Sequence, residues 1–269
     1  MPGRTANPLS LHHLTALDVS PPDLVSIAAT LGCDHVCLFT QVQAATRDLF
    51  PCVEDEAMRR AVAERCADTG ISVHNIEYFP IEVGVDLELY QPAFERGARL
   101  GARRATAHIH DPQLDRAVAG FAALCDIARG HGLRIGLEFT AFSQVRTLRA
   151  ALAFVAEAGR ENGDVVLDAL HFFRNGGDVV ELATMDLSRI GYVQINDGPA
   201  KIAEDQRFQE AVHERGLPGE GVFPLREFVA ALPPRPVIDV EVPQARRMAS
   251  GIPAMERARL AVVAARSVF

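Results

Sequence analysis

Residues 114–140 read LDRAVAGFAALCDIARGHGLRIGLEFT, and this stretch shows the unit from which the chain is built. From Leu114 to His131 apolar side chains recur at helical spacing, which is typical of a helix that packs on one face. Gly132 follows, and glycine readily adopts the left-handed conformation that ends many helices. From Arg134 to Thr140 the chain changes to a short β-type run. The stretch therefore predicts a helix, a tight turn and a strand.

This alternation recurs along the whole chain. The β-type runs are Leu9 to Leu17, His35 to Thr40, Ser72 to Phe79, Ala105 to Ile109, Arg134 to Thr140, Val165 to Leu170, Gly191 to Asn196 and Val237 to Val242. The helical stretches are Pro22 to Leu31, Asp55 to Thr69, Leu89 to Leu100, Leu114 to His131, Thr147 to Ala158, Leu225 to Leu232 and Pro253 to Val268. Alternating strands and helices predict a parallel sheet, and eight strands is the number that closes a barrel. We therefore expect an α/β fold, a (β/α)8 TIM barrel, with a doubly wound open sheet as the alternative.

Length and composition agree with a single barrel domain over residues 1–269. The chain has 269 residues, and barrels of this kind commonly use about 250 for one domain. No low-complexity segment or linker marks a boundary. The N-terminus lacks the apolar core of a signal peptide, and no apolar run approaches the roughly 18 residues of a membrane span. We therefore expect a cytoplasmic protein without a membrane partner, whose five cysteines are small buried side chains.

The charge disfavours nucleic acid as a partner. The formal net charge is −8, and Lys201 is the only lysine. Binding to a duplex depends largely on basic side chains that neutralise phosphates, so an acidic chain is a poor candidate for it. A small-molecule substrate is the expected partner, and a homo-oligomer is left open.

One connection is much longer than the others. Residues 197–223 carry many charges and end in Leu217-Pro-Gly-Glu-Gly221. Long connections in compact domains are usually functional lids or disordered segments. In a barrel this one follows a strand, so we expect it over the C-terminal face, where barrel active sites lie. A surface excursion without a role is the alternative.

The last four strands each deliver one oxygen-bearing side chain to the same mouth of the barrel. Alternation along residues 134–139 and 237–242 places Glu138 and Glu241 inside, and the same parity places Gln194 inside and Asp168 at the end of its strand. Three carboxylates at one mouth repel one another unless they are paired, and a divalent cation removes that cost. Oxygen ligands favour Mg, Mn or Ca, although Zn and Co also use such sites. The alternative is that each acid pairs with an arginine or caps a helix.

His171 and Arg174 follow Asp168 closely enough to reach this mouth. His171 can serve as an acid or base or orient a substrate hydroxyl, or it is an ordinary loop histidine. Arg174 can hold an anionic or hydroxyl-rich substrate, or it neutralises Asp168.

Other polar residues have weaker signals. Glu77 has inward parity and is a candidate substrate contact, and His108 and His110 share one strand face. These histidines can bind substrate or a second metal, although hydrogen-bonded barrel histidines are the more common case. Arg207 and Arg215 lie in the long connection, where they can reach a carboxylate or phosphate of the substrate or remain solvated.

Three more polar residues are considered without a catalytic role. Asp239 is expected one layer below Glu241, paired with Arg134. His12 and His13 are adjacent, so at most one of them faces inward, and neither is assigned a function.

The order of these motifs resembles the xylose isomerase-like TIM barrel superfamily, often called sugar phosphate isomerase/epimerase-like, which includes the AP endonuclease family 2 fold. The resemblance covers nearly the whole chain. The motifs that carry it are Leu137-Glu138-Phe139, Asp168-Ala-Leu-His171, Tyr192-Val-Gln194-Ile-Asn-Asp197, Pro218-Gly-Glu-Gly221 and Glu241.

The resemblance implies one divalent metal ion, Mn, Mg or Co with Zn as a further option, held by Glu138, Asp168, Gln194 and Glu241. Many epimerases of the superfamily have His where this chain has Gln194, whereas hydroxypyruvate isomerase-like members have Gln there. In the epimerases the two metal-bound glutamates transfer protons on opposite faces of a keto-sugar, so Glu138 and Glu241 would be catalytic, with His171 on the substrate. The implied reaction is isomerisation or epimerisation of a keto-sugar or related hydroxy-ketone through a metal-stabilised enediolate.

Three other functions remain open beside this one. The same residues would serve a dehydratase of a cyclic hydroxy-ketone such as a keto-inositol, or of a keto-acid such as dehydroshikimate, because only the fate of the enediolate differs. A DNA-repair nuclease is disfavoured because that branch has a histidine-rich three-zinc cluster and a DNA-binding groove. This chain instead has Gln194 among its predicted ligands and is acidic, with a single lysine. A barrel that only binds a ligand is disfavoured by the complete set of acids.

Overall fold

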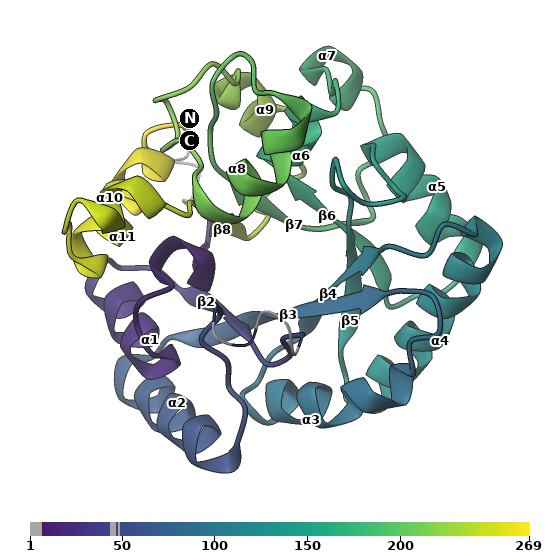
Figure 1. The fold of residues 1–269 in the computed structure, drawn as a ribbon, viewed down its shortest axis with the longest axis horizontal. Helices are drawn as coiled ribbons and strands as arrows, with labels where there is room; N and C mark the ends of the chain where they lie inside the picture. The colour runs from purple at the N-terminus through teal and green to yellow at the C-terminus, as the bar shows by residue number, and fades with distance from the viewer. Residues whose placement is uncertain (1–6, 44–46, 48) are drawn as a thin grey trace.

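Eight parallel strands form a closed barrel in chain order, with the helices arranged around it (Figure 1). The computed structural model describes residues 7–43, 47 and 49–269. The strands are β1 (Leu9–His12), β2 (His35–Phe39), β3 (Ser72–Ile81), β4 (Arg104–Ile109), β5 (Arg134–Glu138), β6 (Gly163–Asp168), β7 (Ile190–Ile195) and β8 (Ile238–Val240). The TIM barrel is thus confirmed, and the alternative of an open doubly wound sheet is wrong.

Helices follow the strands, and several begin and end at the residues that their sequence signals predict. They are α1 (Pro21–Thr30), α2 (Glu56–Thr69), α3 (Gln91–Arg99), α4 (Leu114–Gly130), α5 (Leu148–Ala158), α6 (Ala169–Arg174), α7 (Val179–Leu182), α8 (Arg207–His213), α9 (Leu225–Ala230), α10 (Ala245–Ala249) and α11 (Ala254–Arg266). Asp55 caps α2 by accepting a hydrogen bond from the Met58 amide at 2.8 Å, as an N-cap acid does. Gly70 ends the same helix with a φ of 77°, which glycine adopts without a Cβ clash.

The apolar side of each strand packs under the helices. Ile135 and Leu137 of β5 and Val193 and Ile195 of β7 are fully buried there. The intervening positions face the barrel axis, which leaves room at the carboxyl ends for polar side chains. Within the part of the chain that the structure describes, no helix has the length and apolar character needed to cross a membrane.

The strand prediction overextends at both ends of the chain. The run from Leu9 to Leu17 is a strand only to His12, and a 3₁₀ helix, η1 (His13–Ala16), follows it. This turn is stabilised locally because Nδ1 of His12 accepts a hydrogen bond from the Leu14 amide at 3.0 Å. The last strand is also shorter than the predicted run from Val237 to Val242.

The long connection 197–223 has internal structure that its composition did not predict. It holds a 3₁₀ turn, η4 (Glu204–Gln206), followed directly by α8. Its base is closed by Asp197 and Gly216, whose backbones exchange hydrogen bonds of 2.9 and 2.8 Å. The Asp197 carboxylate also accepts hydrogen bonds from the Gly219 and Phe223 amides at 2.9 and 3.1 Å. The connection is therefore tied into a compact unit that lies beside the ends of β7 and β8 (Figure 1).

Candidate active site

Three of the four predicted ligands meet at the mouth of the barrel. Glu138, Asp168 and Glu241 are buried, and one carboxylate oxygen of each lies within 4.8 Å of the other two. They come from β5, β6 and the residue just past β8. Gln194 of β7 is the register partner of Asp168 on one side and of Asp239 on the other, and it is also fully buried. The four strand ends therefore converge as the alternation predicted.

Asp168 is the most heavily bonded of the acids. One oxygen caps α6 by accepting from the His171 amide at 3.0 Å, and the other accepts from Asn196 Nδ2 at 3.0 Å. That second oxygen also accepts from Nη1 of Arg215 at 2.8 Å. Asp168 is thus fixed by its own helix, by the next strand and by the long connection.

Two histidines contact Glu138. His108 Nε2 lies 2.8 Å from one carboxylate oxygen, and His171 Nε2 lies 3.7 Å from the other. Burial opposes the charged form of His108, but the hydrogen bond and negative charge of Glu138 outweigh it and raise the pKa of His108. For His171 burial is the largest effect and lowers the pKa, so this ring is neutral near pH 7. Glu138 therefore lies between a histidine that favours a proton and one that does not.

Glu241 shares Arg215 with Asp168. Its Oε1 lies 2.9 Å from Nη2 of Arg215, whereas burial raises the pKa of the Glu241 carboxyl well above its usual range. Burial of Arg215 disfavours its charge, but the charges of Glu241 and Asp168 overcome this and raise the pKa of the guanidinium. One arginine thus neutralises part of the acid set, which is what the arginine-pairing alternative predicts for these two residues.

The buried polar atoms left without partners fit a divalent cation. Both amide atoms of Gln194 and Oε2 of Glu241 are buried and have no hydrogen-bond partner among the described residues. Native proteins seldom bury such atoms unpaired, so they mark a place for a ligand that supplies the missing interactions. The available donors are carboxylate and amide oxygens, which suit hard divalent cations. Glu138, Asp168, Gln194 and Glu241 therefore have the chemistry of a metal site.

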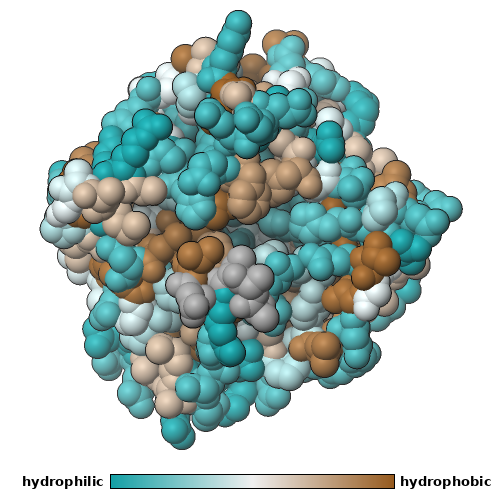
Figure 2. All heavy atoms as spheres, viewed as in Figure 1, coloured by the Kyte–Doolittle hydropathy of each residue, from teal (hydrophilic) through white to brown (hydrophobic). Residues whose placement is uncertain are grey.

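A cavity of about 190 Å³ opens above these residues. Its floor carries Glu77, His108, Glu138, His171, Arg215 and Glu241, and its walls carry Leu14, Phe39, Leu49, Phe50, Tyr78, His110, Phe142, Phe208, Ala211, Val212 and His213. Figure 2 shows apolar side chains beside a hollow near the middle of this face. The long connection contributes part of the wall through α8. A small polar ligand with an apolar face would fit such a pocket.

The remaining predicted residues lie in different places. Glu77 and His108 line the cavity, but Arg174 and Arg207 do not. Arg174 instead donates to Glu210 of α8 at 2.8 and 2.6 Å and lies over the ring of Phe223, 5.0 Å from its centroid. Arg174 therefore contacts the long connection at Glu210 and Phe223, outside the cavity.

Two sequence expectations are incorrect in detail. Arg134 does not pair with Asp239; its Nε donates to Asp164 at 2.9 Å, because both residues lie at the opposite end of the barrel from the cavity. The solvated alternative for Arg215 is also wrong, because this side chain is buried between two acids and lines the cavity. The signal that could have identified it is the need of three buried carboxylates for a nearby cation.

Three of the five cysteines are buried as expected, and two are not fully buried. Cys33, Cys37 and Cys125 are buried, Cys52 and Cys66 are partly buried, and all five are free thiols. They take no part in a disulfide framework.

Comparisons with known proteins agree with this architecture. Inosose isomerase of Halalkalibacterium halodurans is 30% identical over 114 residues, which cover 40% of this chain and 38% of that protein. A 3-dehydroshikimate dehydratase of Pseudomonas aeruginosa is 28% identical over 224 residues, which cover 78% of this chain and 33% of that protein. The matched regions thus span 38% and 33% of the two relatives, well under half of either. A solved structure of the IOLI protein with a bound zinc atom has the same fold, with a TM-score of 0.79, 20% identity and 97% coverage of both chains.

A family model for the xylose isomerase-like TIM barrel matches residues 25–260. The match includes the ends of the last four strands and the whole long connection. The order of motifs in the sequence, the closed barrel and this match all agree, and the chain belongs to the xylose isomerase-like TIM barrel family.

Proposed function

We propose that this protein is a divalent-metal-dependent isomerase or epimerase of a keto-sugar or related hydroxy-ketone. The observation that carries the proposal is the convergence of Glu138, Asp168 and Glu241 beside the unpartnered amide of Gln194. Acids arranged in this way are costly in the apo protein and useful only if they hold a cation or move protons. The named relatives include an isomerase, which supports the same class of chemistry.

The four residues would hold one ion, for which Mn, Mg and Co are the first candidates and Zn a further one. When bound, such an ion polarises a substrate carbonyl and stabilises the charge that develops as the adjacent C–H loses its proton. Asp168 is fixed by three interactions and would act mainly as a ligand. The chain itself supplies the groups that move the proton.

Glu138 and Glu241 are the groups proposed for proton transfer. They end β5 and β8, three strands apart around the closed barrel, so they approach a molecule in the cavity from different sides. One carboxylate would remove the α-proton and the other would return a proton to the new position or the opposite face. His171, neutral and buried beside Glu138, would hold a substrate hydroxyl.

Substrate binding is proposed for residues that line the cavity. Glu77 and His108 fulfil that condition, and Arg215 is the only arginine among the described residues that line it. Arg174 and Arg207 do not line the cavity and rank behind these residues. We therefore place Glu77 and His108 first among the substrate contacts.

A dehydratase is the second candidate, and one comparison favours it. The similarity to 3-dehydroshikimate dehydratase extends over 78% of this chain, about twice the span matched by the isomerase. The same acid set serves a lyase if a hydroxyl leaves from the β-carbon after the proton is removed. The two reactions share every residue up to that point, so the product decides between them.

Solvent deuterium exchange tests the proposal. The protein is loaded separately with Mn²⁺, Mg²⁺, Co²⁺ or Zn²⁺ and incubated in D₂O with a keto-inositol, a ketohexose and 3-dehydroshikimate. Deuterium uptake without loss of water is expected for an isomerase, whereas loss of water from the ketone would favour the lyase. Glu138→Gln and Glu241→Gln should each reduce exchange at least about 100-fold, and the exposed Glu64→Gln on α2 should leave it unchanged. Absence of exchange and of dehydration with every metal and ketone would reject both candidates.

A further inference from the structure

One acidic side chain that is not among the four proposed ligands also lines the cavity, and a buried histidine lies beside it. Glu77 of β3 lines the cavity, and its Oε2 lies 3.0 Å from Nε2 of His12 at the end of β1. His12 is fully buried and does not line the cavity, so it can act on a ligand only through Glu77. The sequence alone assigns His12 no role, yet its contact is to a cavity residue.

The orientation of the His12 ring is fixed from the other side. Nδ1 accepts a hydrogen bond from the Leu14 amide at 3.0 Å, so in the neutral ring the hydrogen is on Nε2. The neighbouring negative charges also favour a second proton on this ring, against the cost of burial. Nε2 therefore carries a hydrogen in both forms, and this nitrogen lies 3.0 Å from Oε2 of Glu77.

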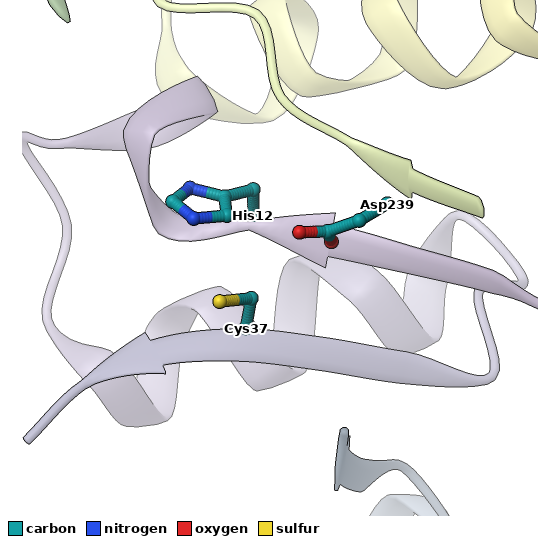
Figure 3. A group of neighbouring side chains, drawn as sticks. All are labelled: His12, Cys37 and Asp239. Atoms are coloured by element: carbon teal, nitrogen blue, oxygen red, sulfur yellow. The ribbon is translucent and has the colours of Figure 1, made fainter. Parts of the chain in front are cut away.

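The same ring belongs to a cluster that has the composition of a metal site. His12, Cys37 and Asp239 come from β1, β2 and β8, and one ligand atom of each lies within 4.8 Å of the others (Figure 3). A metal requires a free nitrogen lone pair, but Leu14 occupies one of the two and a hydrogen occupies the other. Burial also raises the pKa of the Cys37 thiol well above its usual range, which keeps it protonated. The cluster is therefore the packing environment of His12.

Glu77 is held on its other oxygen as well. Oε1 accepts from Asn75 Nδ2 at 3.1 Å and from the Tyr192 hydroxyl at 3.3 Å. Donors from β3 and β7 thus converge on one oxygen of this carboxylate, and His12 of β1 lies beside the other oxygen. A carboxylate has about four acceptor positions, and beside the two hydrogen bonds on Oε1 Glu77 has the 3.0 Å contact of Oε2 with His12. One acceptor position remains for a ligand in the cavity.

We propose that Glu77 accepts a hydrogen bond from a substrate hydroxyl remote from the reacting carbon atoms, and that His12 is the positioning residue that fixes Glu77 for this contact. This rests on the proposed function and narrows its substrate to a polyhydroxylated ketone, with at least one hydroxyl beyond the reacting hydroxy-ketone unit. A carboxylate surrounded by donors selects for a hydroxyl, because a substrate without one leaves a buried acceptor unpaired.

Kinetics on two ketones tests this inference. A keto-inositol carries the remote hydroxyls, whereas hydroxyacetone contains only the reacting unit. Exchange into each is measured with the Mn²⁺ protein and with Glu77→Gln, His12→Gln and His13→Gln. His13 is a matched control, because it is buried next to His12 but contacts the Val19 carbonyl at 3.1 Å and does not line the cavity.

Glu77→Gln should lower kcat/KM for the keto-inositol roughly 10- to 100-fold, mainly through KM. The glutamine side chain replaces one acceptor oxygen by an NH₂ donor, which cannot accept a hydrogen bond from the substrate hydroxyl or from the donors around Glu77. His12→Gln should have a smaller effect of the same kind, and His13→Gln none. His13→Gln should exchange hydroxyacetone at the wild-type rate, whereas Glu77→Gln and His12→Gln should lose less exchange on hydroxyacetone than on the keto-inositol; all variants should bind Mn²⁺ equally. Equal losses on both ketones, a change in kcat alone, or equal effects of His12→Gln and His13→Gln would overturn the inference.

A second measurement separates this inference from the proposed function. Imidazole ¹H–¹⁵N spectra should show a hydrogen on Nε2 of His12 whose signal shifts in Glu77→Gln and stays unchanged in His13→Gln. If the wild type exchanges no ketone, the proposed function fails. The spectra then test by themselves whether His12 pairs with Glu77. A hydrogen only on Nδ1, or a signal insensitive to Glu77→Gln, would overturn it.

Discussion

The guanidinium of Arg215 lies 2.8 Å from the carboxylate of Asp168, and both side chains are buried at the mouth of the barrel. Its other nitrogen contacts Glu241 at 2.9 Å. Arg215 is part of the long connection, whereas both acids are anchored at strand ends. This single side chain therefore couples the connection to the acids that we propose as metal ligands.

Arg215→Met should destabilise the metal-free protein and make its stability depend on metal. Removing one partner of a buried ion pair leaves uncompensated charge and costs about 3–5 kcal/mol. A divalent cation would compensate the same acids, so millimolar Mn²⁺ should restore much of the loss. Urea unfolding with and without Mn²⁺ measures both effects. Arg149→Met, an exposed pair with Glu181 on the outside of the barrel, is the control and should cost less than about 1 kcal/mol in either condition. Equal behaviour of the two variants would contradict the charge-compensating role of Arg215.

Gly221→Ala should impair the site through the long connection. A Cβ at Gly221 would overlap the Asp197 carboxylate and the Gly198 carbonyl, so the Asp197 hydrogen bonds must rearrange. Arg215 lies within the same closed unit and should lose its position. We expect at least about a tenfold loss of exchange activity with a smaller effect on global unfolding, because the strained contacts lie outside the barrel core. Gly130→Ala at the end of α4, where a Cβ meets nothing within 4 Å, is the control. Unchanged activity in Gly221→Ala would show that the connection does not set the site geometry.

Acid should destabilise the fold partly through His13. Burial lowers the pKa of His13 from 6.5 to about 4. Between those values the unfolded chain binds a proton that the folded chain does not, so the free energy of unfolding falls as the pH falls from about 6.5 to about 4. The contribution of His13 is about 3 kcal/mol across this range. His13→Gln should therefore flatten the pH dependence measured by urea unfolding, while His74, with a pKa lowered by burial to about 3, retains its part. An unchanged slope in His13→Gln would contradict this assignment.

Much of the barrel followed from local signals in the sequence. Alternation placed Glu138 and Gln194 inside because a strand has a side-chain period of two. Helix limits were readable where a cap acts locally, as with Asp55 and Gly70. The extent of β1 was not readable, because the hydrogen bond of the His12 ring to the Leu14 amide turns the chain one residue after the strand.

At the site, contacts between residues far apart in the sequence could not be predicted. The bond of Arg215 to Asp168 joins residues 47 positions apart, and no local pattern encodes it. Arg134 illustrates the same limit: alternation predicts that it faces inward and pairs with Asp239, but its partner is Asp164 of the neighbouring β6. Parity gives the direction of a side chain, whereas strand register and loop closure decide which charge it meets.

Manganese binding to the wild type and to Gln194→Leu tests the central claim most directly. Gln194 makes no hydrogen bond through its amide among the described residues, so leucine removes a proposed ligand without removing a contact. An EPR titration should find one Mn²⁺ per chain in the wild type and an affinity at least about tenfold weaker in the variant, whose metal-free stability should be unchanged or higher. Equal affinity in the two proteins, or no bound ion in the wild type, would contradict the assignment of the strand-end residues as a metal site.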